Sequence, residues 1–417
     1  MYMEANMKKI AALVAVIFII PFALFAKGDY GTPGEFLNWG AGARSLAMGK
    51  AFTALADDPS AIYYNPAGLA LQNPIQIALQ HVFLFEDTMY DFGAFTYPIS
   101  GIGTFAFGYI RLGSMNFDAR DEQWTDLGKF DIADQAFILS YGREITGWLA
   151  FGLNLKVINQ TNFESSSTGF GIDAGAIWSP SNYFSLGLSV INALPPTSLK
   201  LIETAETYPV ILKAGVALKL FGDRVMPAMD VEQEFGGRDF KFRMGIDIYP
   251  FQQLALRAGY DETEVAFGAG FFWRPIRLDY AIGFGDLGFS NRLTLTFAFG
   301  GFDINLSADP KIFSPVGTRR TTTVSIYAET KYPIEEWELN ILNEDGDVVR
   351  SYSGNEKPPK FVTWDGKDDR GLPVSDGEYK CVMKVKDKTG RTLESNSETV
   401  KISSSIPMQP GTIQLEE

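Results

Sequence analysis

Residues 74–299 form a long series of short segments in which apolar side chains recur at every second position. We count fourteen such segments, each of roughly 10–12 residues, which is the spacing of transmembrane β-strands. In one of them Leu149, Phe151, Leu153, Leu155 and Val157 alternate with Ala150, Gly152, Asn154 and Lys156. Successive side chains of a strand point to opposite faces, so the series predicts strands with one apolar face and one small or polar face. Past residue 28 no stretch of about 18 apolar residues occurs, which excludes a helical membrane protein.

The strands of a soluble β-sandwich also alternate apolar and polar side chains. The lengths of the connections between segments distinguish a sandwich from a barrel. The long connections 113–130, 160–167 and 193–208 follow odd-numbered segments, whereas those after even-numbered segments are short and contain Gly or Pro. Aromatic residues also gather at the short-turn ends: Tyr97, Tyr141, Trp148, Trp178, Tyr183, Tyr249 and Trp273. Outer-membrane barrels have short periplasmic turns, longer outer loops and aromatic girdles.

The sequence therefore predicts an all-β fold with a 14-stranded transmembrane antiparallel β-barrel over residues 74–300, set in the outer-membrane lipid bilayer. An even number of strands places both ends of the barrel on the periplasmic side. Pro227 interrupts the ninth segment, which predicts a bulge there or a miscount of the strands.

The N-terminus has the layout of an export signal. Lys8 and Lys9 precede the apolar run 10–25, and small residues follow at Ala26 and Gly28. Residues 1–28 are therefore predicted to be a signal peptide, with a retained anchor as the alternative. The net charge of −14 and the pI near 4.7 argue against nucleic acid as a partner.

Between signal and barrel, residues 29–73 are predicted to form an N-terminal hatch or plug. Asp58-Pro59 and Asn65-Pro66 each place an N-cap acceptor before a proline, which predicts two very short helices. A surface loop with two turns is the alternative, but the Gly and Ala of the inner barrel face leave volume for a plug. The candidate hatch residues are Asp58, Pro59, Asn65, Pro66, Ala67 and Gly68.

Charges of both signs fall on the inward face of the predicted strands. They are Lys156, Asp173, Lys213, Lys241, Arg243, Asp247, Arg257, Arg277 and Asp279. Mixed charges inside a barrel form ion pairs along the lumen or hold a plug. We expect several of them to pair with residues 30–70, and substrate selection is the alternative role.

Residues 318–403 are more charged than the preceding segments, and their pattern predicts a small β-sandwich. Charged strands near 322–328, 337–342, 347–352, 360–364, 378–387 and 398–402 are separated by turns such as Asp365-Gly366 and Asp376-Gly377. Strand parity places this domain in the periplasm. Residues 404–417 are predicted to be a flexible tail.

The stretch Gly40–Ala70 resembles the N-terminal signature of the PorV/PorQ family, relatives of the FadL fatty-acid channels. In FadL-like proteins a fourteen-stranded barrel is closed by a hatch with an Asn-Pro-Ala sequence, matched here by Asn65-Pro66-Ala67. The stretch Trp364–Asp387 is similar to the immunoglobulin-like domain of FlgD, an appendage that PorV-type proteins often lack.

The two resemblances imply different functions. A PorV-type protein would bind exported cargo or secretion-system subunits, as outer-membrane components of type IX secretion do. A FadL-type protein would pass long-chain fatty acids or other hydrophobic small molecules. A structural anchor that joins the outer membrane to periplasmic partners is compatible with either.

The residue inventory argues against an enzyme, a cofactor or a metal. His81 is the single histidine and alternates onto the apolar face, away from the lumen. One His and one Cys cannot build a zinc site. The Asp365, Asp368 and Asp369 cluster could hold calcium, but its spacing departs from the EF-hand, so a solvated turn is favoured. Cys381 is predicted to lie in the core of the sandwich.

Overall fold

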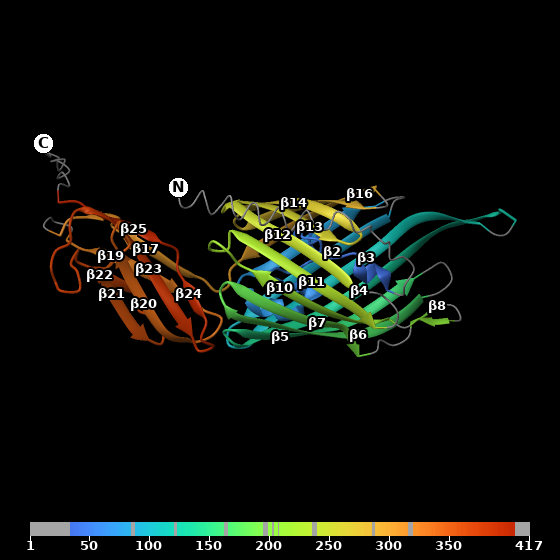
Figure 1. Ribbon diagram of the computed structural model, residues 1–417, viewed down its shortest axis with the longest axis horizontal. Helices are drawn as coiled ribbons and strands as arrows, with labels where there is room; N and C mark the ends of the chain where they lie inside the picture. Colours follow the sequence, from blue (N-terminus) through green and yellow to red (C-terminus); the bar gives the residue numbers. More distant parts are fainter. Residues whose placement is uncertain are drawn as a thin grey trace, which may run out of the picture. The chain divides into compact units, whose positions relative to one another are not determined.

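The computed structural model describes residues 34–84, 88–120, 123–161, 166–194, 199–201, 204–206, 208–235, 240–285, 288–315 and 320–404 (Figure 1). The predicted signal peptide, 1–28, lies outside the described residues, as does 405–417 of the predicted tail. None of the described helices has the length and apolar character needed to cross a bilayer. The chain divides into a barrel unit with its hatch and a C-terminal unit, and each is treated by itself.

Fourteen strands close into one barrel. They are β1 (Ile75–Phe83), β2 (Thr88–Ile99), β3 (Gly103–Arg120), β4 (Asp126–Thr146), β5 (Leu149–Thr161), β6 (Ser166–Ser181), β7 (Phe184–Leu194), β10 (Val210–Leu218), β11 (Val225–Phe235), β12 (Lys241–Phe251), β13 (Leu254–Asp261), β14 (Glu264–Trp273), β15 (Ile276–Gly285) and β16 (Gly288–Phe299). The first and last strands pair antiparallel from Ile75↔Phe299 to Phe83↔Asn291, which closes the wall. The predicted 14-stranded antiparallel barrel is confirmed.

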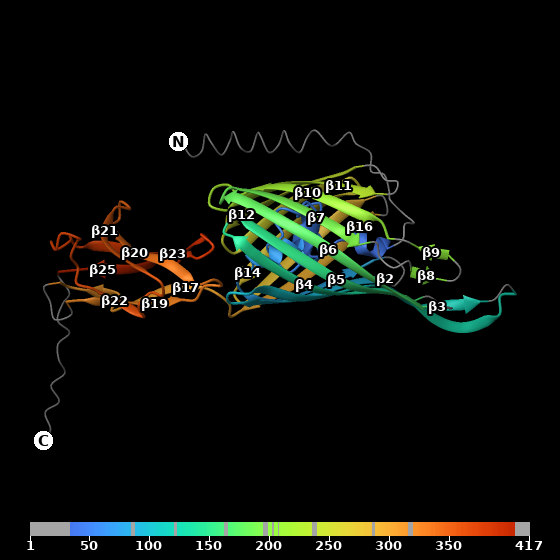
Figure 2. The same ribbon diagram turned by 90° about the horizontal axis from the view of Figure 1, so that it is seen from below.

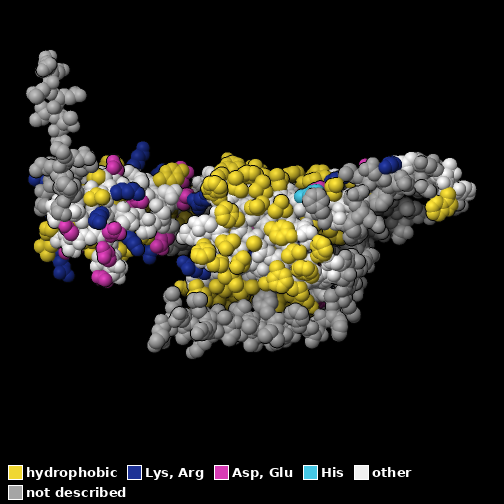
Figure 3. Space-filling view, turned by 90° about the horizontal axis from the view of Figure 1, so that it is seen from above, with side chains coloured by type: hydrophobic (Ala, Val, Ile, Leu, Met, Phe, Trp, Pro, Cys, Tyr) yellow, Lys and Arg dark blue, Asp and Glu magenta, His cyan; other side chains and the backbone are white. Residues whose placement is uncertain are grey.

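The alternation of each strand becomes an outer and an inner face of the wall. On β5 the side chains of Phe151, Leu153 and Leu155 are 48%, 54% and 54% exposed, whereas Asn154 and Lys156 are buried. Figure 3 shows apolar side chains (yellow) spread over this outer surface of the barrel. Since exposed apolar area is unfavourable in water, the outer face suits an apolar surrounding.

The aromatic side chains at the short-turn ends are exposed, except those of Tyr141 and Tyr249, which are half-buried. Trp148, Trp178 and Trp273 are among the exposed ones. Tyr249 instead lies on the inner face, where its hydroxyl donates to Asp247 Oδ2 at 3.0 Å. Tyr249 is two residues from the inward-facing Asp247, so alternation turns both side chains inward. Its prediction as a girdle aromatic was wrong.

The predicted long loop 113–130 was also wrong, because β3 and β4 continue as a two-stranded ribbon. Their pairing runs on from Gly113↔Ala133 to Arg120↔Asp126, with a bulge between Ser114 and Phe117. Figure 2 shows this ribbon extending past the neighbouring strands. A ribbon lets the two chain segments satisfy backbone hydrogen bonds against each other beyond the wall. Two further short strands, β8 (Leu199–Leu201) and β9 (Thr204–Glu206), form a hairpin between β7 and β10.

Pro227 lies in β11 without a bulge, so that prediction was wrong as well. The β11–β12 ladder runs from Val225↔Ile248 to Glu232↔Lys241 without a register shift and includes Pro227↔Ile246. On its other side β11 pairs with β10 only as far as Ala217↔Ala228, so this ladder stops one residue short of Pro227. The proline therefore lies where β10 requires no donor from it, which is how a strand tolerates this residue.

From residue 34 on, where the structure describes it, the hatch has four short helices inside the barrel (blue in Figure 1). They are η2 (Glu35–Asn38), α2 (Ala43–Ala47), α3 (Ala61–Tyr64) and η3 (Pro66–Leu71), where two were predicted. Helix α3 begins after Ser60 and not at Pro59, because Asp58 Oδ1 accepts from the Ser60 amide at 2.9 Å and holds a turn there. Asn65 precedes η3, and its Oδ1 accepts from the Ala67 amide at 3.1 Å.

The C-terminal unit is a sandwich of two sheets. One has the order β17 (Ile304–Asp309), β19 (Thr322–Ala328), β22 (Phe361–Trp364). The other has the order β18 (Ile312–Phe313), β25 (Glu398–Ile402), β23 (Gly377–Asp387), β20 (Ile334–Leu342), β21 (Val348–Asn355), with β24 (Thr392–Glu394) beside β23. Trp364, Cys381 and Leu339 are fully buried between them. The sandwich begins before the predicted residue 318, because β17 pairs along its whole length with β19.

Candidate functional site

Glycines form the part of the inner wall that meets the hatch. We call Gly152, Gly175, Gly187, Gly215, Gly245 and Gly259 the glycine girdle. They face each other in pairs across three ladders, β5–β6, β7–β10 and β12–β13. A Cβ at Gly152 would overlap the Pro66 main chain, and one at Gly245 would overlap that of Met48. The hatch therefore lies directly on the wall, in space that a larger side chain would fill.

Arg44 of helix α2 is the central charge of the hatch. Its Nε lies 2.8 Å from Asp247 Oδ2 on β12, and its Nη1 contacts Asp57 and, at 3.3 Å, Asp58. The Arg44 side chain is 5% exposed and that of Asp247 is fully buried. An ion pair with this burial costs much desolvation and is retained only if its hydrogen bonds are satisfied. Arg44 thus joins two hatch carboxylates to one carboxylate of the wall.

Two further carboxylates of the wall hold the hatch. Asp230 Oδ2 on β11 accepts hydrogen bonds from the Phe52 and Thr53 amides at 2.9 and 2.8 Å. Asp261 Oδ2, at the end of β13, lies 2.6 Å from Lys50 Nζ. Hydrogen bonds to an ionised group are stronger than neutral ones, so both contacts fix the hatch loop after α2.

Neutral side chains complete the attachment on the other strands. Asn65 Nδ2 donates to the Ala176 carbonyl of β6 at 3.1 Å. Asn154 Nδ2 of β5 donates to the Ile62 carbonyl at 2.8 Å. Thr294 Oγ1 of β16 accepts from the Ala43 amide at 2.8 Å. The hatch is thus hydrogen-bonded to strands on several sides of the barrel, which fixes its orientation as well as its position.

The predicted inward charges mostly pair with one another across the wall. Asp247 bridges wall and hatch, since its Oδ1 also accepts from Arg257 Nε at 2.9 Å. Lys213 Nζ lies 5.7 Å from the Tyr63 ring centre of α3, while Lys241 is half-buried at the start of β12. The wall pairs are Lys156–Asp173 at 2.7 Å, Lys213–Glu232 at 3.2 Å, Arg243–Glu232 at 2.6 Å, Arg257–Asp279 at 2.8 Å and Arg277–Asp279 at 2.5 Å. Of these nine charges, Asp247 forms an ion pair with a hatch residue, Arg44.

Of the candidate hatch residues, Asn65 and Pro66 approach the wall most closely. They lie over Gly175 and Gly152, and Ala67 is buried beside them. Gly68 instead faces the hatch itself, where a Cβ would overlap the Ala56 carbonyl. The sequence analysis missed Arg44, Lys50, Asp230 and Asp261. The alternation of β11 could have identified one of them, because it turns Asp230 inward and its neighbour Met229 outward.

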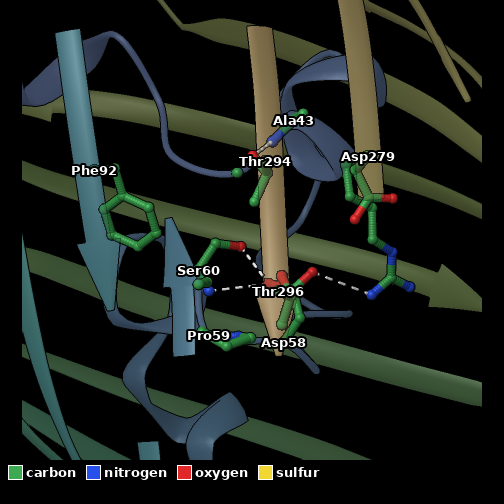
Figure 4. Close-up of a pocket in the computed structure, with 11 residues that line it drawn as sticks. Ala43, Asp58, Pro59, Ser60, Phe92, Asp279, Thr294 and Thr296 are labelled. Atoms are coloured by element: carbon green, nitrogen blue, oxygen red, sulfur yellow. Dashed lines mark hydrogen bonds and ion pairs between the residues drawn. The ribbon is translucent and has the colours of Figure 1, made fainter. Parts of the chain in front are cut away.

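Little space remains around the hatch. A polar cavity between hatch and wall is lined by Arg44, Asp58, Ser60, Asp279, Thr294 and Thr296, among others. Figure 4 shows Phe92 beside this cavity and the Ala43 amide directed at Thr294. A second cavity is lined by Leu37, Tyr63, Ile191, Tyr208, Ile211 and Lys213, among others. Both are small enough that water is the natural occupant.

The remaining candidates lie away from the lumen. His81 is on the outer face, where Nδ1 lies 2.6 Å from Asp91 Oδ1 of β2. Asp368 Oδ1 accepts from the Arg370 and Leu372 amides at 2.9 and 2.8 Å, so it closes a turn. Within the described residues, no group of three or more His, Cys, Asp or Glu side chains could hold a metal ion.

Two separate segments of the chain match known protein families. Residues 36–169 match the Uncharacterised protein family (UPF0164), and residues 314–390 match the FlgD Ig-like domain. The predicted FlgD-like domain is confirmed, whereas the PorV/PorQ resemblance stays a prediction. No curated protein matches the chain.

Among solved structures, the chain is similar to the toluene transporter TodX of Pseudomonas putida. The identity is 15%, the match covers 62% of this chain and 96% of that one, and the TM-score is 0.44. It is also similar to a FadL homologue of Pseudomonas aeruginosa, at 14% identity over 67% and 100% of the two chains, with a TM-score of 0.40. Likenesses this distant say nothing about what this barrel binds.

Proposed function

We propose that this protein is a non-enzymatic outer-membrane barrel that stays plugged and acts through its surfaces, as a binding platform for exported proteins or secretion machinery. The observation that carries the proposal is the attachment of the hatch to the glycine girdle. Hatch main chain occupies the positions of absent wall side chains, so a solute has no path through the lumen in this state.

The wall gives a second reason to prefer a surface role. A transporter that releases its solute sideways needs a kinked or interrupted strand, and Pro227 was the one candidate in the sequence. The β11–β12 ladder is continuous at Pro227. The protein also carries a second folded unit, which a passive pore does not need. In the proposed topology this unit follows β16 into the periplasm, where it reaches partners that the membrane-embedded barrel cannot.

The proposal is tested by isolating the protein from its native envelope in mild detergent after reversible crosslinking. We expect secretion subunits or exported proteins to be recovered in stoichiometric amount, and a deletion strain to lose specific proteins from the culture medium. Recovery of tightly bound lipid with no protein partner, together with an unchanged secreted fraction, would contradict the proposal.

The hatch itself is tested by deleting residues 34–70 and recording single-channel currents in planar bilayers. We expect the intact protein to be closed and the deletion to conduct. A deletion that stays closed would show that the hatch does not plug the barrel. Heat-modifiable migration on gels, a property of folded barrels, controls for assembly of both proteins.

A transporter of hydrophobic small molecules is the second candidate. The cavity beside η2 combines Leu37, Ile191 and Ile211 with Tyr63 and the Lys213 ammonium, but in this closed state it has room for water only. Its lining would suit an amphipathic acid if the hatch moved and enlarged it. If fatty-acid uptake by intact cells fell in the deletion strain while secretion was unchanged, this function would replace the first.

A further inference from the structure

The two ends of the described hatch lie at opposite ends of the barrel. We call the end that carries the long connections the outer mouth and the end that carries the short turns the inner mouth. Strand β7 finishes and β10 begins at the outer mouth, where Val210 pairs with Phe235 at the end of β11. Strands β1 and β16 meet at the inner mouth, where Ile75 pairs with Phe299. These pairs mark the two levels between which the hatch lies.

The described part of the hatch begins at the outer mouth. Gly34, its first residue, is buried beneath Tyr208, which comes two residues before β10. A Cβ on Gly34 would lie 1.8 Å from Tyr208 Cε1, so the contact requires glycine. Trp39, just past η2, stacks on Tyr90 near the outer end of β2, with 6.3 Å between the ring centres. The cavity beside η2 has the same surroundings, since hatch residues line it together with Ile191, Asn192 and Pro209.

The last helix of the hatch, η3, lies near the inner mouth. A Cβ on Gly142, near the short-turn end of β4, would lie 2.8 Å from the η3 main chain. Just after η3, Gln72 Oε1 accepts a hydrogen bond from Gln76 Nε2 of β1 at 3.3 Å. The chain then enters the wall at Ile75. The hatch is therefore joined covalently to the wall at the inner mouth and crosses the lumen to the outer mouth.

A short stretch separates Gly34 from the predicted end of the signal peptide. Cleavage after Gly28 would leave residues 29–33 ahead of the described hatch. Fully extended, five residues span at most about 17 Å, whereas the apolar band of an outer-membrane barrel is about 25 Å tall. The lumen between the two mouths is also occupied by the hatch itself. A mature N-terminus that starts at residue 29 therefore cannot reach back to the inner mouth through the barrel.

We propose that the mature N-terminus is displayed on the outer surface of the cell, at the outer mouth. In the proposed topology the short turns face the periplasm, so the hatch passes through the membrane inside its own barrel. The plug thus contributes residues to the cell surface, and a partner that bound them would act directly on the plug. The inference rests on the proposed orientation of the barrel and on the predicted signal cleavage, but not on the proposed binding of exported proteins.

The test labels single introduced cysteines on intact cells with a maleimide coupled to a polymer too large to cross the outer membrane. Tyr30→Cys reports on the N-terminus, Lys129→Cys on the β3–β4 ribbon, and Asn182→Cys on the exposed turn between β6 and β7 at the inner mouth. Native Cys381 is fully buried and stays in all three variants. We expect Tyr30→Cys to be labelled like Lys129→Cys and at least ten-fold more than Asn182→Cys, which should be labelled only after permeabilisation.

The grouping of the three variants decides the outcome. Labelling of Tyr30→Cys only in permeabilised cells, together with Asn182→Cys, would place the N-terminus in the periplasm and overturn the proposal. A mature mass that includes the signal segment would overturn it too. If Lys129→Cys and Asn182→Cys exchanged their behaviour, the proposed orientation of the barrel would be wrong, and the proposal would fall with it. None of these results depends on whether exported proteins bind the barrel.

A second pair of variants examines whether the hatch is held at the outer mouth. Gly34→Val adds a side chain that overlaps the Tyr208 ring. Gly101→Val is the matched control, because Gly101 has nearly the same φ, 72° against 75°, and nothing lies within 4 Å of its built Cβ. Gly34→Val should expose the hatch to protease added outside intact cells, and Gly101→Val should not. Equal resistance of the two variants, or cleavage of Gly34→Val only after permeabilisation, would contradict the proposal, with heat-modifiable migration as the check on assembly.

Discussion

Arg44 of the hatch and Asp247 of β12 form an ion pair, with 2.8 Å between Nε and Oδ2, inside the barrel. Asp247 also accepts from Arg257, which in turn contacts Asp279 of β15. A continuous chain of charges therefore runs from the hatch through three strands of the wall. Because the members are buried, each depends on its neighbours for neutralisation.

Replacing Arg44 by Met should loosen the hatch. The substitution removes the cation between Asp57, Asp58 and Asp247, and loss of one partner of a buried pair costs about 3–5 kcal/mol. We expect a lower midpoint in urea, read from the gel shift of the folded barrel, and the appearance of ion conductance in planar bilayers. Lys367→Met is the control, since the Lys367–Asp365 pair is about half exposed and such pairs contribute at most about 1 kcal/mol. Equal stability of the two variants would contradict the role given to Arg44.

A leucine at Gly175 should displace the hatch. A Cβ at this position would overlap Asn65 Oδ1, so the larger side chain forces the Asn65-Pro66 turn away from β6. Overpacking costs about 1–3 kcal/mol in ordinary cores, and we expect at least that here. Gly93→Leu is the matched control, because Gly93 lies on the outer face of β2 and its nearest neighbour, Leu79 Cδ2, is 3.7 Å from a built Cβ. Protease sensitivity of residues 34–72 measures the displacement, and identical digestion of both variants would refute it.

A charge on the outer face should be costly in the middle of the apolar band and tolerated near its edge. Leu153 lies in the middle of β5, and Asn159 lies on the same face near the end of that strand. In a bilayer, arginine at the midplane costs about 2–4 kcal/mol and near the interface about 0–1 kcal/mol. We expect Leu153→Arg to reduce assembly in lipid vesicles and Asn159→Arg to leave it nearly unchanged. Equal effects would mean that this face does not contact lipid.

The Cys381 thiol should be unreactive in the folded protein. Burial, with a smaller effect of Glu398, raises the pKa of this thiol to about 12, well above the ordinary value. Maleimide should therefore label Cys381 only after unfolding in urea, as measured by mass spectrometry.

The raised pKa of Cys381 also sets the sign of a pH effect. Between the ordinary thiol pKa of about 8.5 and about 12, the unfolded chain loses a proton that the folded chain keeps. The free energy of unfolding of the C-terminal unit should thus fall as pH rises through this window. Cys381→Ala should lower stability overall but remove that slope, and rapid labelling of the folded wild type would contradict both expectations.

The barrel was predictable because each strand repeats a two-residue pattern against an apolar outside. Alternation did not reveal two elements that are defined mainly by backbone pairing with another strand. The β3–β4 ribbon was taken for a loop, although its backbone pairing continues to Arg120↔Asp126. Likewise β17 was missed because its assignment depends on pairing with β19, which local sequence does not reveal.

The candidate site was predictable only in part. Alternation placed Asp247 and Lys213 inward, but which charge meets which depends on strand register and on the path of the hatch. Arg44 lies outside any strand, in a five-residue helix whose position follows from contacts with β13, β14 and β15. The girdle glycines carried the stronger signal, because inward glycines on neighbouring strands imply that main chain approaches them.

The pairing of β1 with β16 constrains how such a molecule can be made. The hatch precedes β1 in the chain, yet the wall around it is complete only once the last barrel strand has met the first. A nascent chain that stops short of Phe299 would leave an open sheet. Asp261 and Asp230, which bind Lys50 and the Phe52 amide in the closed barrel, would then still face water. Closure of the β1–β16 ladder therefore completes in one step both the wall and the enclosure in which the hatch is held.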